Sequence, residues 1–177
     1  MRHNSTTLTT ESLVDLESLH FSVLMSVYSA TRAGDLDRCL ESLTVQSAPP
    51  NEIVLVRDGP VDISVERCIE NYAQFFLFRH LHFPQNRGLG HTLRDGLLAC
   101  DHELVARVDS DDWSVPERFE LQIAFLKQNP SISVIGGWLR EHYQSSTDLV
   151  PVVRQTPVDY RSLERAARRR NPINHPT

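Results

Sequence analysis

The sequence predicts an α/β protein, a three-layer α/β/α domain built around a mostly parallel sheet. Short apolar runs rich in β-branched residues alternate with segments in which apolar residues recur at helical spacing. Acidic residues directly follow two of these runs, at the end that would form the carboxyl edge of a parallel sheet. The alternation is typical of βαβ units, and 177 residues suit one such domain.

Composition excludes several classes of function. With 23% charged residues and a formal net charge of -5, the chain lacks the basic excess of nucleic-acid binders, so no nucleic-acid partner is expected. Its 3 cysteines are widely spaced within apolar patterns, which predicts small core residues rather than disulfides or a zinc site. No run approaches the roughly 18 apolar residues of a membrane span, and no secretory signal is recognisable, so a cytoplasmic location is expected.

A flexible lead-in over residues 1–19, rich in Ser and Thr, is expected before the first strand–helix unit. The β-rich run over 20–29 predicts the first central strand, which ends at Tyr28. Leucines then recur at helical spacing and predict a helix, for which Asp35 is the expected N-cap. A Pro-Pro pair closes that segment.

The second and third units repeat the pattern. A strand over 52–56 runs into Asp58 and Gly59, so an acid lies at a strand's carboxyl end beside a turn-making glycine. After a second helix, an aromatic-rich third strand is expected over 75–83. The loop over 86–90 leads to a third helix. Its two glycines let the backbone approach a ligand closely, and a plain tight turn is the alternative.

The stretch over 103–116 is the most informative part of the sequence. An apolar run there ends in Asp109, Asp111 and Asp112. Three acids within four residues repel one another, so they are expected where water screens them or a cation compensates them. A divalent metal that holds a diphosphate fits the second case. The alternative is an acidic turn in which Asp112 or Ser114 only caps the next helix.

The alternation of strands and helices continues for one more unit after this stretch and then stops. A helix is expected behind Ser114, and a further strand over 132–135. Residues 141–157 are polar and irregular, and residues 160–170 predict a short basic helix. The arginine run that ends this helix is expected as a solvated face, with contact to phosphate or acidic lipid as the alternative.

Taken together, these pieces resemble family 2 glycosyltransferases of the GT-A fold. The resemblance rests on motifs in the family's order and spacing, including a DxD motif at Asp109–Asp111. It implies that residues 20–177 form a GT-A glycosyltransferase domain without its C-terminal acceptor half. The matching pieces are residues 23–28, 52–59, 86–90 with Gly96 and Leu97, 109–112 with Pro116 and Arg118, and 171–172 with 175–177.

The resemblance implies a donor site for a nucleotide-diphosphate sugar, with UDP as the expected nucleotide. Tyr28 is expected to stack on or flank the base, and Asp58 to accept from the base's imide N–H. Arg94 is expected to neutralise phosphate or read the base, although many relatives carry an arginine where this chain has Leu93. The other residues expected to bind the donor are Ser26, Gly59, Asn86, Gly88, Asp109 and Ser110.

A divalent cation is also implied. Asp111 is the leading ligand of Mn²⁺ or Mg²⁺, Asp109 is expected at the ribose or in the metal's shell, and Asp112 shares the metal or caps a helix. The cation would stabilise the charge that develops on the departing diphosphate, and it needs few protein oxygens because diphosphate and water complete its shell. In the family that the chain resembles, the catalytic base is an acid C-terminal to the Asn-Pro…His-Pro segment, so the resemblance implies a base beyond Thr177. His175 is the alternative, but nothing in the sequence shows what positions it.

The implied activity is a metal-dependent, inverting sugar transfer to a glycan or lipid-linked acceptor, in polysaccharide or glycolipid synthesis. Peripheral association with the inner face of the membrane is expected. The alternative is a nucleotide-binding module without turnover, acting as a regulatory or assembly partner. A phosphatase is disfavoured because the acids follow a late strand, and a nucleotidyltransferase because the loop over 29–35 is not glycine-rich.

Overall fold

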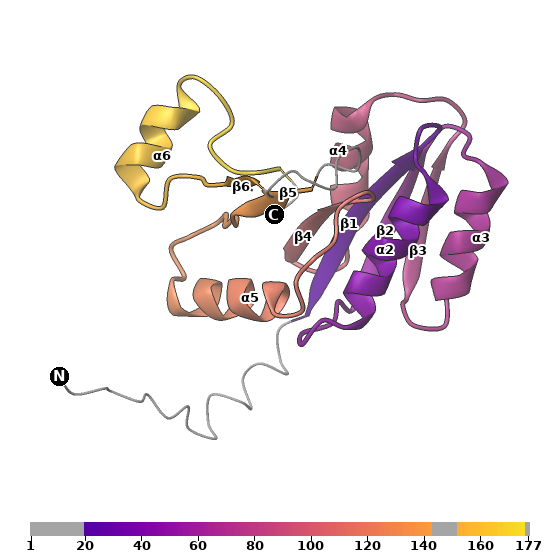
Figure 1. Ribbon diagram of the computed structural model, residues 1–177, viewed down its shortest axis with the longest axis horizontal. Helices are drawn as coiled ribbons and strands as arrows, with labels where there is room; N and C mark the ends of the chain where they lie inside the picture. The colour runs from indigo at the N-terminus through magenta and orange to yellow at the C-terminus, as the bar shows by residue number, and fades with distance from the viewer. Residues whose placement is uncertain (1–19, 143–151, 176–177) are drawn as a thin grey trace.

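The computed structural model describes residues 20–142 and 152–175, and its centre is a parallel sheet in the order β3-β2-β1-β4 (Figure 1). The predicted α/β fold with a mostly parallel sheet is confirmed, whereas the predicted lead-in over 1–19 lies outside the described residues. The strands are β1 (Phe21–Tyr28), β2 (Glu52–Asp58), β3 (Phe78–Phe83) and β4 (Leu104–Asp109). The helices that alternate with them are α2 (Ala33–Thr44), α3 (Ile63–Tyr72), α4 (Leu89–Ala99) and α5 (Arg118–Gln128).

Helices cover both faces of this sheet, which makes the three predicted layers. Successive side chains of a strand point to opposite faces, so β1 supplies Val23 and Met25 to one core and Leu24 to the other. The first core joins the sheet to α2, α3 and α5, and the second joins it to α4 through Leu93. Figure 1 shows β1 in the middle of this arrangement, with its neighbours β2 and β4 on either side.

Helix α4 packs unusually close to the sheet because it presents a glycine there. A Cβ on Gly96 would lie 2.5 Å from Leu24 Cδ1 and 2.8 Å from Val56 Cγ2. Such contacts are shorter than real Cβ atoms make, so a side chain at this position would push the helix away. The missing side chain therefore sets the distance between α4 and the sheet.

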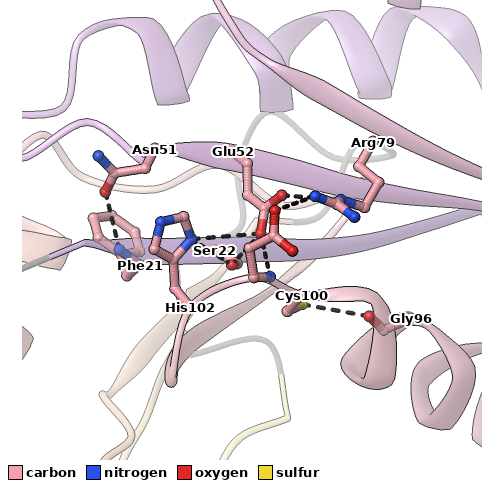
Figure 2. A network of polar contacts seen from close by, with 9 residues as sticks. Phe21, Ser22, Asn51, Glu52, Arg79, Gly96, Cys100 and His102 are labelled. Atoms are coloured by element: carbon pink, nitrogen blue, oxygen red, sulfur yellow. Dashed lines mark hydrogen bonds and ion pairs between the residues drawn. The ribbon is translucent and has the colours of Figure 1, made fainter.

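A buried polar network closes the amino edge of the sheet (Figure 2). Glu52 is 2% exposed, and its Oε1 accepts from Ser22 Oγ at 2.6 Å and from the Asp101 amide at 2.7 Å. Arg79 Nε donates to Oε2 at 3.3 Å, and His102 Nδ1 lies 3.0 Å from Ser22 Oγ. Because these residues belong to β1, β2, β3 and the turn before β4, the network joins three strands to the turn that leads into the fourth.

The prediction of a strand over 132–135 is wrong. Residues 132–138 have no regular structure, and Val134 is 64% exposed. β-branched residues form a strand only where a neighbouring strand pairs with them, and within the described residues the main sheet ends at β4. The third strand also begins later than expected, at Phe78 rather than Phe75.

Two expected helix caps are also wrong. The N-cap of α2 is Arg32, and Asp35 lies inside the first turn. The N-cap of α5 is Glu117, so neither Ser114 nor Asp112 caps that helix. Helix α2 begins before Asp35, which pairs with Arg38 inside the helix, and α5 begins after Ser114, whose hydroxyl accepts from Arg118 instead.

A small antiparallel ladder, β5 (Leu139–Glu141) with β6 (Val152–Arg154), follows, and then α6 (Tyr160–Ala167), which confirms the predicted short basic helix. Figure 1 shows these elements on the β4 side of the main sheet. The 3 cysteines are free, and Cys39 and Cys68 are buried, as predicted. Among the described residues, no helix has the length and apolar character needed to cross a membrane.

Candidate donor site

The carboxyl edge of the main sheet brings most of the expected site residues together. Tyr28 and Asp58 are paired at the ends of β1 and β2, and Ser26 is paired with Asp109 of β4. Parallel strands end at the same edge, so side chains from three neighbouring strands meet there. Tyr28 is 48% exposed, which leaves its ring available to a ligand.

Asp58 anchors the loop that follows β3. Its Oδ1 accepts from the Arg87 amide at 2.7 Å and its Oδ2 from the Gly88 amide at 3.0 Å, while Asn86 Nδ2 donates to the Asp58 carbonyl at 3.3 Å. The residue is only 4% exposed. Each carboxylate oxygen can accept more than one hydrogen bond, so Asp58 can hold the loop and still accept from a ligand.

Glycines allow the two loops to approach each other. Gly59 has φ +87°, and a Cβ on it would lie 2.9 Å from the Asn86 backbone nitrogen. Gly88 also has a positive φ, +85°, but nothing lies within 4 Å of its ideal Cβ. Gly59 thus allows the two loops to approach each other closely, and the positive φ of Gly88 fits the tight turn that was the alternative for the loop over 86–90.

Arg94 lies on α4 and is drawn into an ion pair with its neighbour. Its side chain is 63% exposed, and its Nη2 lies 2.7 Å from Asp95 Oδ1. Asp95 also pairs with Arg87, and the hydrogen bonds from Arg87 and then Arg94 lower the pKa of its carboxyl. Arg87 was not singled out from the sequence, yet its guanidinium lies 3.7 Å from the centre of the Phe83 ring, beside the loop that Asp58 holds.

The acidic residues after β4 form a tight turn. The Asp112 amide donates to the Asp109 carbonyl at 3.2 Å, and the Asp109 carboxylate pairs with Arg107. Ser110 is 9% exposed, whereas Asp111 and Asp112 are exposed. Partial burial, followed by repulsion from Asp109 and Asp111, raises the pKa of the Asp112 carboxyl.

Arg118 fastens this turn to the sheet, a role that the sequence did not reveal. Its Nη2 donates to the Arg107 carbonyl and its Nη1 to Ser114 Oγ, both at 2.9 Å. Ser114 in turn donates its amide to Ser42 Oγ of α2 at 3.0 Å. Burial lowers the pKa of the Arg118 guanidinium to about 10, and the group still carries its charge at neutral pH.

The acids suit a cation only if the ligand completes its coordination. Among the described residues, no group of three or more His, Cys, Asp or Glu side chains converges to hold a metal ion. Asp109 is paired with Arg107, which leaves Asp111 and Asp112, and both line a cleft of ≈1370 Å³. One or two carboxylates, together with diphosphate and water, suit Mg²⁺ or Mn²⁺. His175 lies elsewhere, in a second cavity beside Phe21 and Phe119.

The parallel sheet brings the polar side chains and a tight acidic turn together at its carboxyl edge, which is the edge where open α/β sheets bind their ligands. The chain belongs to glycosyl transferase family 2, whose family model matches residues 22–176. The resemblance seen in the sequence is therefore confirmed, and so is the GT-A fold.

Relatives and a solved structure agree with this assignment. The amylovoran biosynthesis glycosyltransferase AmsE of Erwinia amylovora is 36% identical, across 88% of this chain and 57% of its own length. The UDP-Gal:alpha-D-GlcNAc-diphosphoundecaprenol beta-1,3-galactosyltransferase of Escherichia coli is 30% identical, across 88% of this chain and 56% of its own. The chain therefore spans just over half the length of these relatives. The structure of S. aureus TarS 1–349 in complex with UDP-GlcNAc has a TM-score of 0.56 and 26% identity, over 63% of this chain and 32% of that one.

Proposed function

We propose that this chain forms the donor-binding part of a metal-dependent, inverting glycosyltransferase. It binds a nucleotide-diphosphate sugar, with UDP as the nucleotide, for transfer to a hydroxyl of a glycan or lipid-linked acceptor at the inner face of the membrane. The meeting of Tyr28, Asp58 and the acidic turn at one sheet edge carries the proposal. The names of the relatives, one in amylovoran synthesis and one acting on a diphosphoundecaprenol-linked sugar, support a role in polysaccharide or glycolipid synthesis.

The side chains have separate tasks in this proposal. Tyr28 offers its exposed ring to the base, and Asp58 accepts the base's imide N–H. Asp109 lies next to Ser26, where it accepts from the ribose, and Asp111 holds the cation. The cation, when bound, stabilises the charge on the departing diphosphate. We place the base that deprotonates the acceptor outside residues 20–177.

Calorimetric titration of UDP, in Mn²⁺ and then in chelator, tests the proposal. The wild-type chain is expected to bind UDP only with metal. Asp111→Asn removes a negative charge without changing shape, so metal-dependent affinity should fall at least about tenfold. Glu103→Gln is the matched control, because Glu103 is exposed and precedes β4 at the opposite edge of the sheet.

Three results would count against the proposal. If neither UDP nor any other nucleoside diphosphate binds, with or without metal, the proposed donor site is wrong. Equal affinity with and without metal would remove the cation from the site. An unchanged affinity of Asp111→Asn would show that this carboxylate is not the ligand.

A further inference from the structure

We propose that the cavity lined by β4, α5 and residues 171–175 binds an apolar chain with a single carboxylate, as in a fatty acid. The cavity has a volume of ≈340 Å³ and is the one that His175 lines. Among the described residues, only Arg118 and Gln122 line both this cavity and the larger cleft of Asp111 and Asp112. The cavity is thus separate from the donor site, and the inference does not depend on the proposed function.

Most of the cavity wall is apolar. The sheet contributes Phe21 and Ala106, and α5 contributes Phe119 and Ile123. The other apolar residues of the wall are Leu104, Val105, Leu126, Val134, Ile135 and Ile173. An apolar cavity of about 150 Å³ takes up benzene, so a cavity of this size accepts a chain of roughly eight to ten carbons.

The charge of the wall is entirely positive. Although the chain has a formal net charge of -5, no carboxylate lines the cavity within the described residues. The cationic side chains of the wall are Arg107 and Arg118, and Arg107 is paired with Asp109. One guanidinium, that of Arg118, is therefore left to decide which ligand the wall attracts.

Arg118 has only neutral hydrogen-bond partners in the described part of the chain. Its Nη1 donates to the Ser114 hydroxyl and its Nη2 to the Arg107 carbonyl, both at 2.9 Å, and its Nε is buried without an acceptor. A charge shielded from water is normally compensated by a charge of opposite sign. Here the apolar cavity lies beside the charge, so an anion bound there would compensate it.

A carboxylate fits this charge better than a phosphate does. The carboxylate carries one negative charge at neutral pH, whereas a phosphate monoester carries about 1.5 to 2. Both Nη groups of Arg118 are already engaged, so the fork that binds phosphate is not available. Gln122 lies one helical turn after Arg118 and has no hydrogen bond within the described residues, so its amide can donate to the same carboxylate.

Calorimetric titration of octanoate into the chain tests the proposal. We expect saturable binding with a Kd below about 1 mM. Octan-1-ol lacks the charge, octyltrimethylammonium reverses it and butyrate lacks most of the chain, so each should bind at least about tenfold more weakly. Absence of octanoate binding, or equal binding of any of these three compounds, would overturn the proposal. Tighter binding of octyl phosphate would overturn the choice of a carboxylate head.

A matched pair of tryptophan variants locates the binding site. Val134 lines the cavity and is 64% exposed, so Val134→Trp can fill the space without disturbing the buried core. Leu121→Trp is the control, because Leu121 is 65% exposed on α5 and lies outside the cavity. Octanoate affinity should fall at least about tenfold in Val134→Trp and stay unchanged in Leu121→Trp. The same affinity in both variants would show that octanoate binds elsewhere.

A second pair of variants tests the charge. Gln122→Glu places a carboxylate four residues after Arg118 on the same helix, where it can pair with the guanidinium and support the fold. The affinity for octanoate should then fall about tenfold. Gln128→Glu adds the same charge to an exposed position of α5 outside the cavity and should have no effect.

The two pairs of variants have separate outcomes. Equal weakening by Gln122→Glu and Gln128→Glu would indicate general repulsion rather than a site, and unchanged affinity in Gln122→Glu would exclude Arg118 as the attracting group. Circular dichroism checks that each variant is folded, and the charge pair still tests the cavity if Val134→Trp does not fold. None of these titrations contains nucleotide, so failure here leaves the donor site standing.

Discussion

Arg118 shows how one partly buried residue can hold the acidic turn in place at the wall of the cleft that the turn lines. Its guanidinium connects the Arg107 carbonyl of β4 with Ser114, and the acidic turn lies between these two points. Loss of both hydrogen bonds would leave a carbonyl and a hydroxyl unsatisfied and would free the turn. We therefore regard Arg118 as a positioning residue for Asp111 and Asp112.

We predict that Arg118→Met lowers the free energy of unfolding by about 2–3 kcal/mol, because buried polar partners lose their donors. Arg118→Lys keeps the charge, but its single ammonium group cannot donate to both partners as the guanidinium does. This variant should remain folded, and its metal-dependent affinity for UDP should be about tenfold weaker. Urea unfolding and calorimetry measure the two effects separately. Wild-type affinity in a folded Arg118→Lys protein would mean that the residue is only structural.

The residues at the site differ in how far the sequence revealed them. Asp58 and Gly59 were predictable, because an acid and a glycine directly after a buried strand must lie at the carboxyl edge. The partners of Arg94 and Arg107 were not, since an ion pair depends on the rotamers and neighbours that the folded loops bring together. A motif fixes where the backbone runs, but it leaves the pairing of long exposed side chains open.

At the scale of elements, α4 links packing to the donor loop. The helix begins directly after the loop that Asp58 holds, and Gly96 lets it lie against Leu24 and Val56. Displacing the helix would move its first turn, together with Gly88, away from Asp58.

Gly96→Ala is predicted to destabilise the protein by about 1–3 kcal/mol, because the added methyl group meets buried side chains of the sheet. Gly90→Ala is the matched control on the same helix. Nothing lies within 4 Å of its ideal Cβ, so this change should be neutral or stabilise by up to about 1 kcal/mol. Thermal unfolding followed by circular dichroism compares the two variants. Equal stability of both would show that α4 has room to adjust.

Buried elements were easier to predict than boundaries and edges. The strands β1 and β2 are apolar throughout and the helices show a regular apolar face, so burial dictates both patterns. The missing strand over 132–135 has equally suitable residues but lacks a pairing neighbour in the described chain. Pairing is a property of the assembled sheet, so a local pattern does not determine it.

At the scale of the whole molecule, the two edges of the main sheet have different roles. The exposed Tyr28 and the acidic turn both lie at the carboxyl edge. The carboxylates of the turn repel one another, and this repulsion opposes folding. The amino edge buries one charge, Glu52, among partners from β1, β3 and the turn before β4. We infer that the network around Glu52 offsets part of the cost of the acidic edge.

The Glu52 network predicts a specific loss of stability in acid. Its hydrogen bonds and Arg79 outweigh the cost of burial and lower the pKa of the Glu52 carboxyl in the folded protein. The unfolded chain has the ordinary value of about 4.3, so the contribution is complete above that pH and is lost as the pH falls through the lower folded value. Glu52→Gln should therefore cost about 3 kcal/mol at pH 7 and progressively less below about pH 4.

Urea unfolding at pH 7, 5 and 3.5 measures this difference. Asp101→Asn is the matched control, because Asp101 pairs with the same arginine but its side chain is 60% exposed, and its loss should cost less than about 1 kcal/mol at any of these pH values. The amide of Asp101 still donates to Glu52 in that variant, so the buried charge keeps its nearest donors. If the Glu52→Gln difference is the same at every pH, the charge contributes nothing and only the shape of the side chain matters. A difference that shrinks in acid would instead locate the acid sensitivity of the fold at the edge of the sheet farthest from the donor site.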